Sequence, residues 1–261
     1  MHTGTDIEEI AVEFEAGVLQ IRINRPHKKN ALHGPMYTRM ADLLEEAGRT
    51  QEVRVIYITG SPDCFSSGND VSTFGADDAT SADELPAVRF LRTIAHSEVP
   101  IVAAVNGPAI GVGTTMLMHC DVVIAGEDAV FQTPFVDLGV SPEAASSFLM
   151  PLRLGYLRAA EMLLQGEAFD AQKASDCGLV NRVCDSADYQ REALATAQRL
   201  AAAPPTSLRA TKRVLRAPLI PGIEEAMGRE NAEFARCMES PEFAEAITAF
   251  MERRPADFGN C

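Results

Sequence analysis

The sequence predicts an α/β fold, in which strands buried inside the protein alternate with helices. Three observations lead to this class. Short, almost entirely apolar runs are typical of strands covered on both faces, apolar residues at helical spacing fill the intervals, and residues 156–261 are rich in Ala, Leu, Glu and Arg without a long strand pattern. A chain of 261 residues, 46% of them hydrophobic, can bury one large core and a smaller appendage.

The elements of the core follow one another in a regular order. Four apolar runs are predicted to be strands: residues 18–23, 53–59, 101–105 and 122–125. A polar, turn-rich loop at residues 25–34 follows the first strand, and Pro35 then opens a helix with one apolar stripe. A second helix is predicted around residues 86–96. This rhythm of strands and helices indicates repeated crossover connections.

The C-terminal part is predicted to be helical. Ser240-Pro241-Glu242 combines an N-cap, a proline at the first helical position and an early acid, so a terminal helix is expected to begin there. The Pro-containing segment 201–205 is the best boundary. We therefore expect residues 1–200 to form the core with the active site, and residues 201–261 to form a helical C-terminal region.

The overall charge argues against nucleic acids and membranes as partners. The 23 Lys and Arg residues against 37 Asp and Glu give a net charge of -14, which repels phosphate backbones and anionic headgroups. The short basic clusters, at residues 27–29 and in the series Arg209, Lys212, Arg213 and Arg216, are enough for one phosphorylated small molecule. The uncharged window 99–120 is interrupted by Pro, Asn and Gly, so a strand, a turn and a helix start are predicted there rather than a membrane span.

The cysteines give no sign of a metal or redox site. Six cysteines are scattered along the chain without a C-x-x-C pair, so zinc-ligand spacing and redox motifs are both missing from the sequence. We expect reduced thiols and no metal. The first ten residues are acidic and carry no basic or apolar signal region, so the expected location is cytoplasmic.

Two predicted strands run out into loops of small residues. One loop is FSSGND at residues 65–70, and the other is PAIGVGTT at residues 108–115. Where such a loop feeds a helix, its unpaired backbone N–H groups favour negative charge. Each loop alone is explained as a turn, and neither matches a Walker or dinucleotide pattern. If the two loops converge, their N–H groups suit the oxyanion of an acyl group.

A third segment, residues 131–147, contains a carboxylate that could act as a base. Ser141-Pro142-Glu143 is interpreted as a helix start with the acid in its first turn, where Glu143 would stabilise the helix dipole and have a depressed pKa. A catalytic base would need apolar walls to raise that pKa again, and Phe135, Val140 and Phe148 are the candidates.

Six segments, in order along the chain, resemble the crotonase (enoyl-CoA hydratase/isomerase) superfamily: INRPHKKNAL, ITGSPDCFSSGND, VNGPAIGVGTTMLMHCD, FQTPFVDLGVSPE, ASDCGLVNRV and FMERRPADF. The resemblance covers essentially the whole chain. It implies a ClpP/crotonase spiral of repeated ββα units, with a C-terminal helical region that covers the coenzyme A site and mediates trimers or hexamers. It also implies an acyl-CoA thioester substrate and no separate cofactor, because coenzyme A is part of the substrate.

The resemblance also indicates the reaction. Hydratases of the superfamily use two glutamates, and Thr115 and Phe135 stand at the matching positions, so hydration should be weak at best. The segment SPEAASS instead resembles the peroxisomal-type delta-3, delta-2-enoyl-CoA isomerases, whose single catalytic glutamate matches Glu143. The related dienoyl-CoA isomerases have a second acid at the Phe135 position, for which Asp137, two residues on in a predicted strand, is the nearest substitute.

The remaining site residues follow from the same resemblance. The backbone N–H groups of Asn69 and Val112 are implied to form the oxyanion hole. Residues implied to bind substrate and coenzyme A are Lys29, Ala31, Ser66, Ser67, Gly68, Asp70, Gly111 and Phe135. Basic side chains that could meet the phosphates are Arg25, Lys28, Lys29 and Arg253. Three alternatives remain open: a residual hydratase, another acyl-CoA reaction such as hydrolysis or decarboxylation, and a non-catalytic acyl-CoA-binding protein.

Overall fold

Six strands form the main sheet, in the order β1-β2-β3-β4-β6-β9. The computed structural model describes residues 7–73 and 85–261, so part of the acidic N-terminal segment used above lies outside the described residues. The strands are β1 (Ile10–Glu15), β2 (Val18–Ile23), β3 (Val55–Thr59), β4 (Ile101–Val105), β6 (Val122–Gly126) and β9 (Arg182–Cys184). Among these described strands, β1 and β2 pair antiparallel, and the other neighbours pair parallel. The four strands predicted from the sequence are thus present, within two residues at their ends.

A second, smaller sheet lies beside the path of the main one and takes its strands from the same part of the chain. It consists of β5 (Pro108–Ile110), β7 (Val130–Gln132) and β8 (Phe169–Asp170), in the order β5-β7-β8. Strand β5 follows β4 directly and β7 follows β6, so these turns of the chain give one strand to each sheet. This is the ββα spiral that the resemblance implied.

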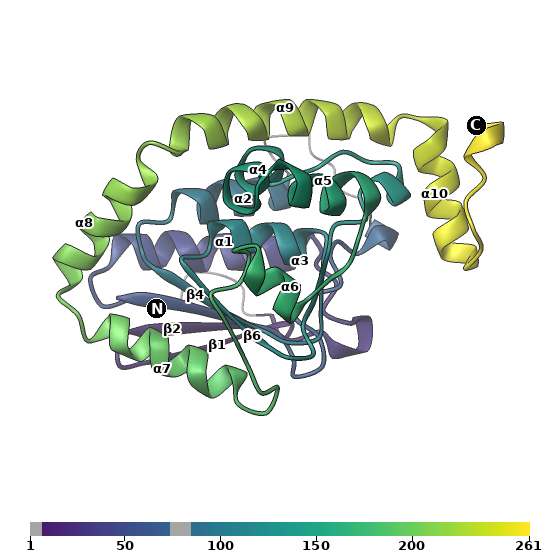
Figure 1. Cartoon of the computed structure of the whole chain (residues 1–261). Coiled ribbons are helices and arrows are strands. Elements are labelled where there is room, and N and C mark those ends of the chain that lie inside the picture. The colour runs from purple at the N-terminus through teal and green to yellow at the C-terminus, as the bar shows by residue number, and fades with distance from the viewer. Residues whose placement is uncertain (1–6, 74–84) are drawn as a thin grey trace.

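Helices cover both faces of the main sheet (Figure 1). The α-helices are α1 (Gly34–Arg49), α2 (Pro86–His96), α3 (Val112–Thr115), α4 (Ser146–Leu154), α5 (Tyr156–Gln165), α6 (Ala171–Asp176), α7 (Tyr189–Ala201), α8 (Pro205–Arg216), α9 (Ile220–Met238) and α10 (Pro241–Glu252). In β3 the residues alternate: Val55 and Tyr57 pack toward α7, whereas Ile56 and Ile58 belong to the larger core on the opposite face. None of the described helices is both long and apolar enough to cross a membrane.

Short 3-10 helices complete the connections. They are η1 (Pro26–Lys28), η2 (Val71–Thr73), η4 (Met116–His119), η5 (Val136–Leu138) and η6 (Phe258–Asn260). Strand β1 was missed by the sequence analysis, because most of its residues are exposed and it carries no continuous apolar run. Asp137 was expected on a strand, but η5 occupies that position, so it does not share a strand face with Phe135.

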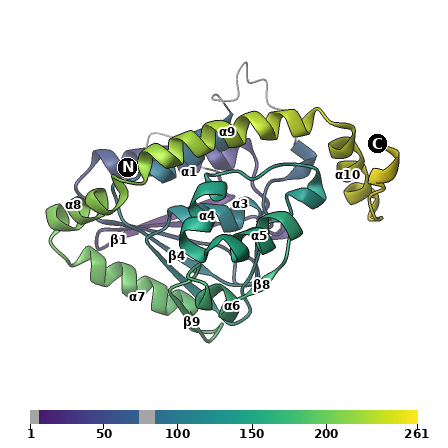
Figure 2. The ribbon, with the colours of Figure 1, turned by 45° about the horizontal axis from the view of Figure 1, so that its top comes forward.

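The C-terminal helices wrap around the core and are tied to it by buried cations (Figures 1 and 2). Arg209 of α8 donates to the carbonyl oxygens of Thr50 and Val53 at 2.7 and 2.9 Å, and Lys212 pairs with Asp121 at 2.7 Å. Although the sequence analysis counted this series as enough for one phosphorylated small molecule, Arg209, Lys212 and Arg216 are buried and hold the C-terminal helices to the core instead. Helix α9 then packs against α2 and α4, and α10 follows at the far end of the molecule.

Candidate active site

The two glycine-containing loops lie against each other beyond the ends of β3 and β4. These strands are parallel neighbours, so their carboxyl ends meet at one edge of the sheet. The loops are joined by the hydrogen bond from Ile110 N to the Ser66 carbonyl, 2.9 Å long. Gly68 and Gly111 both have a positive φ, and a Cβ built on Gly111 would lie 4.0 Å from the Gly68 Cα. A Cβ on Gly68 would lie only 3.0 Å from the Ile110 carbonyl oxygen, so a side chain there would crowd the other loop, whereas at Gly111 it is the positive φ that favours glycine.

The predicted oxyanion-hole residues, Asn69 and Val112, follow these glycines. Val112 is the first residue of α3, so its N–H has no acceptor inside the helix. Neither backbone N–H donates to any residue in the described part of the chain. Both residues line the same cavity, which has a volume of about 800 Å³. Two unused donors are therefore available to a negatively charged oxygen.

The cavity brings together most of the predicted site. Its lining includes Lys29, Ala31, Ser67, Gly68, Asn69, Asp70, Gly111, Val112, Phe135 and Glu143. Ser66 is different: it is fully buried, and its Oγ donates to the Asn30 carbonyl at 2.9 Å and accepts from Gly68 N at 3.2 Å. Ser66 thus holds the loop in place through hydrogen bonds and does not line the cavity.

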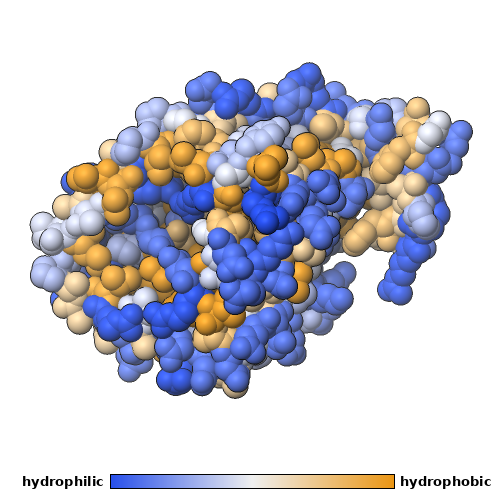
Figure 3. Space-filling model, viewed as in Figure 1, coloured by the Kyte–Doolittle hydropathy of each residue, from blue (hydrophilic) through white to orange (hydrophobic). Residues whose placement is uncertain are grey.

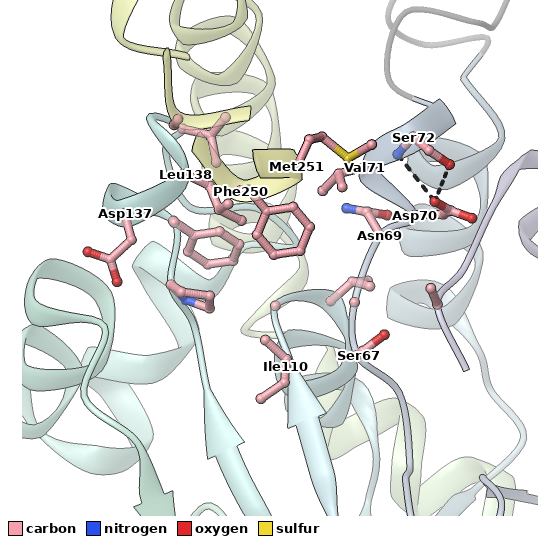
Figure 4. Close-up of a pocket in the computed structure, with 18 of the residues that line it drawn as sticks. Ser67, Asn69, Asp70, Val71, Ser72, Ile110, Asp137, Leu138, Phe250 and Met251 are labelled. Atoms are coloured by element: carbon pink, nitrogen blue, oxygen red, sulfur yellow. Dashed lines mark hydrogen bonds between the residues drawn. The ribbon is translucent and has the colours of Figure 1, made fainter. Parts of the chain in front are cut away.

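Helix α10 forms the opposite wall of the cavity. In Figure 4, Phe250 and Met251 face Asn69 and Val71 across the space. The space-filling view shows the C-terminal segment projecting beyond the body of the protein, with a hollow beneath it (Figure 3). The sequence analysis noted the FMERRPADF segment only as part of the resemblance, and spacing alone did not place Phe250 in the site.

Glu143 is a buried carboxylate on the wall of this cavity. Burial raises its pKa to about 7, with a further contribution from the negative charge of Glu230, while the Asn69 and Thr115 side chains lower it. Within the described residues, Glu143 Oε1 is buried and has no hydrogen-bond partner. A carboxylate with this proton affinity and a free oxygen can accept and return a proton near neutral pH.

The local structure around Glu143 differs from the predicted helix start. Ala144 and Ala145 both lie in the left-handed region, with φ of 61° and 56°, and α4 begins only at Ser146. Glu143 therefore precedes the helix by two residues that cannot belong to a right-handed helix. The expected depression of its pKa by the helix dipole is wrong, and burial dominates instead. Of the proposed apolar walls, Phe135 and Val140 line the cavity, whereas Phe148 packs against Gly222.

A second cavity, of about 220 Å³, also borders Glu143. Its lining is mainly apolar and includes Leu32, Leu91, Phe234 and Met238. Glu143, Asn69 and Phe234 line both cavities, so the carboxylate stands where the larger space meets the smaller one.

Tyr37 is a polar member of the site that the sequence analysis missed. It was assigned to the apolar stripe of the first helix, and its ring is indeed buried. Its hydroxyl donates to Asn69 Oδ1 through a short hydrogen bond. Burial and the nearby Glu143 carboxylate raise the Tyr37 pKa, so the phenol keeps its proton. Nothing in helical spacing distinguishes such a tyrosine from a purely apolar core residue.

The other acids on the cavity differ from Glu143, since Asp70 is held in an ion pair and Asp137 points away from Asn69 (Figure 4). Arg25 pairs with Asp70 at 2.7 Å. Burial acts to raise the pKa of Asp70, but hydrogen bonds from Ser72 and Arg25 outweigh it and lower the pKa to about 2. The Asp137 carboxylate lies against Gly166, where a Cβ would come within 2.9 Å of Oδ2, and it points away from Asn69 in Figure 4.

The basic side chains and the thiol near the loops can also be placed. Arg25 is held by Asp70 and by Glu9, at 3.1 Å, which leaves Lys28, Lys29 and Arg253 of the suggested phosphate contacts on the cavity wall. Burial raises the pKa of the Cys64 thiol to about 11, so it is not a nucleophile at neutral pH. Within residues 7–73 and 85–261, no group of His, Cys, Asp and Glu side chains could hold a metal ion.

The spiral of ββα repeats defines a crotonase-fold protein. Residues 13–260 match the family model described as Enoyl-CoA hydratase/isomerase, and the chain belongs to this family. It is 35% identical to Enoyl-CoA delta isomerase 2 of Rattus norvegicus over 94% of its own length, but spans only 64% of that protein. It is 33% identical to the 2,3-dehydroadipyl-CoA hydratase of Escherichia coli K12, covering 97% of this chain and 99% of that one.

Solved structures give the same family. A crystal structure of an enoyl-CoA hydratase/isomerase from Pseudoalteromonas atlantica superposes with a TM-score of 0.92 and 40% sequence identity, covering 96% of this chain and all of the other. Because relatives of similar identity are named as isomerases and as hydratases, the family alone does not select the reaction.

Proposed function

We propose that the protein is an enoyl-CoA isomerase that moves a double bond from the 3 position to the 2-trans position. The observation that carries this proposal is that Glu143 is the cavity acid with a raised pKa and a free oxygen. Thr115 and Phe135 stand where a hydratase would have its two glutamates, and neither side chain can act as a base. One carboxylate suffices for a proton to leave one carbon and return to another.

The proposed reaction needs only groups of this chain and the substrate. Glu143 removes a proton from the α carbon, and the electrons of the broken C–H bond form a dienolate. The dienolate oxygen accepts hydrogen bonds from the N–H groups of Asn69 and Val112. Glu143 then returns the proton to the γ carbon, and the new double bond is conjugated with the thioester. The smaller apolar cavity next to Glu143 suits the acyl tail.

A direct assay tests the proposal. Purified protein is given a medium-chain 3-enoyl-CoA while the absorbance of the conjugated thioester is followed, and crotonyl-CoA hydration is measured in parallel. Glu143→Gln should lower isomerase turnover by roughly 10²- to 10⁴-fold while acyl-CoA binding is retained, because the general base is lost and the cavity is kept.

The other outcomes select among the alternatives. Fast hydration without isomerisation would assign the chain to the hydratases. Turnover that Glu143→Gln leaves unchanged would contradict the assignment of the base. If neither isomerisation nor hydration is detected, the result would favour hydrolysis, decarboxylation or a purely acyl-CoA-binding role. Activity on a dienoyl-CoA that Asp137→Asn abolishes would point to a two-base reaction.

Assembly and location belong to the same proposal. The resemblance favours a homotrimer or a hexamer, with the C-terminal region involved in assembly, and the expected location stays cytoplasmic. Exposed apolar side chains on α4 and α5 support an interface between copies: Leu152, Tyr156, Leu157 and Leu164. A hydrodynamic mass equal to one chain would contradict this part of the proposal.

A further inference from the structure

The backbone next to Glu143 adopts a conformation that needs support. Ala144 and Ala145 are consecutive non-glycine residues with φ of 61° and 56°. A non-glycine residue in this region is strained, because its Cβ crowds the following carbonyl oxygen. Such strain persists only where surrounding contacts fix the conformation.

A carboxylate from a distant helix supplies part of that support. Glu230 of α9 is only 5% exposed. Its Oε2 accepts from Ala145 N at 2.6 Å, and its Oε1 accepts from Ser147 N at 2.8 Å. Both carboxylate oxygens of Glu230 thus accept hydrogen bonds from backbone N–H groups just after Glu143. Glu230 lies 85 positions away from Ala145 in the sequence.

A histidine holds the same segment from the other side. His119 Nε2 lies 2.9 Å from the Ala144 carbonyl, and Arg216 lies 3.3 Å from Nδ1. Because arginine can only donate, Nδ1 is the acceptor and Nε2 carries the hydrogen that it donates to Ala144. Burial and the charge of Arg216 lower the His119 pKa to about 3, so the ring stays neutral and this tautomer is kept.

We propose that Glu230 is a positioning residue, whose carboxylate clamps the backbone at Ala145 and Ser147 and so fixes where the Glu143 carboxylate stands in the cavity. The inference rests on the proposed role of Glu143 as the base. Glu230 lines neither of the two cavities that Glu143 borders, so it reaches the substrate site through the segment that it holds and through its charge.

The charge of Glu230 has a second effect on Glu143. One buried carboxylate raises the proton affinity of another, and Glu230 acts in this way on Glu143. Asn69 and Thr115 face Glu143 and lower its pKa. Of the other titratable or charged groups, Tyr37 of α1 lies near Glu143, Arg229 of α9 acts on Glu230, and His119 of η4 bonds Ala144. The charges that act on His119 itself are those of Arg216 and Lys212 of α8 and Arg153 of α4.

The test compares Glu230→Gln with Glu233→Gln, an exposed change one turn further along α9. The carboxyl ¹³C signal of Glu143, assigned by its loss in Glu143→Gln, is titrated in the full-length protein, and kcat and KM are measured from pH 5 to 9. In Glu230→Gln the Glu143 pKa should fall below that of the wild type, and kcat should drop roughly 10- to 100-fold with little change in KM, because the base is misplaced. Glu233→Gln should match the wild type in both measurements.

The double variant Glu230→Gln/Ala145→Gly separates the effect of the backbone clamp from the effect of the charge. It also replaces the single variant in the test if that variant does not fold. Glycine adopts a positive φ without strain, so it should restore part of kcat but not the pKa, since the charge is still missing. Unchanged pKa and kcat in Glu230→Gln would overturn the proposal, even if the variant were less stable. If the wild type does not isomerise 3-enoyl-CoA, the proposed function fails. The ¹³C titration still decides whether Glu230 raises the pKa of Glu143.

Discussion

Glu143 and Asp70 line the same cavity, yet their pKa values move in opposite directions. The pKa of Glu143 is raised to about 7, whereas that of Asp70 is lowered to about 2. Burial acts to raise both. Asp70, however, has a guanidinium and a serine as partners, and Glu143 has only neutral polar side chains and a second carboxylate nearby. The partners therefore decide which acid can exchange protons at neutral pH.

The raised pKa of Glu143 should cost folding stability at neutral and alkaline pH. Above its ordinary pKa of 4.5, Glu143 loses its proton in the unfolded chain, while the folded protein keeps the proton up to about pH 7. The free energy of unfolding therefore falls as the pH rises through this window, and levels off above it. Glu143→Gln should be more stable than the wild type by up to about 3 kcal/mol at pH 8, and nearly equal to it at pH 4.

Urea denaturation at both pH values measures this difference. Asp70→Asn is the matched comparison, because the pKa of Asp70 is lowered. Its contribution to stability is present above the ordinary pKa and is lost as the pH falls toward 2, so this variant should be less stable at pH 8. An equal gain for Glu143→Gln at both pH values would contradict the assigned cause.

At the scale of elements, the site depends on how closely two loops approach. A Cβ at Gly68 would lie 3.0 Å from the Ile110 carbonyl oxygen, and Gly68 also has a φ of +93°. An added methyl group would thus push the loops apart next to the N–H groups of Asn69 and Val112.

Gly68→Ala should therefore lower both stability and activity. We expect a loss of roughly 1–3 kcal/mol from the strained backbone and a fall in kcat, because the two donors no longer converge. Gly48→Ala is the control: Gly48 lies within α1 with nothing within 4 Å of its Cβ position, so alanine should raise stability by roughly 0.5–1 kcal/mol. Thermal melts and the isomerase assay measure both effects. Full activity in Gly68→Ala would show that the approach of the loops is not needed.

Elements with a strong local signal were predictable from the sequence. The helix at Pro86–His96, the strand at Ile101–Val105 and the Ser240 N-cap, which accepts from Phe243 N at 3.1 Å, all occur where the pattern placed them. The conformation after Glu143 was not predictable, because Ser-Pro-Glu is also a helix-start pattern. Contacts from Glu230 and His119, far away in the sequence, decide it.

At the scale of the whole molecule, distant parts of an acidic chain bring cations to one cavity. Lys28 and Lys29 lie at η1, near the N-terminus, and Arg253 follows α10 near the C-terminus. The net charge is -14, so this local concentration of positive charge runs against the rest of the surface. Charge spacing along the sequence could not reveal it, because only the fold brings residues 28 and 253 together.

Lys29→Gln and Arg253→Gln should each raise KM for acyl-CoA roughly 2- to 5-fold, as expected for exposed cations that meet phosphates. The effect should decrease with added salt. It should be absent for an N-acetylcysteamine thioester, which lacks the phosphates, and for Arg49→Gln, an exposed cation on α1. An equal rise in KM for both thioesters would mean that these side chains contact the acyl or pantetheine part instead.

The β1–β2 hairpin has a consequence for self-association. Strand β1 is an edge of the main sheet, and an open edge is a template on which another chain can add a strand. Glu13 and Glu15, both exposed, stand along this edge. Two copies aligned edge to edge would bring these carboxylates together, and like charges on adjacent strands weaken pairing. The two carboxylates therefore oppose the edge-to-edge pairing that the exposed Val12 and Phe14 of the same strand would otherwise favour.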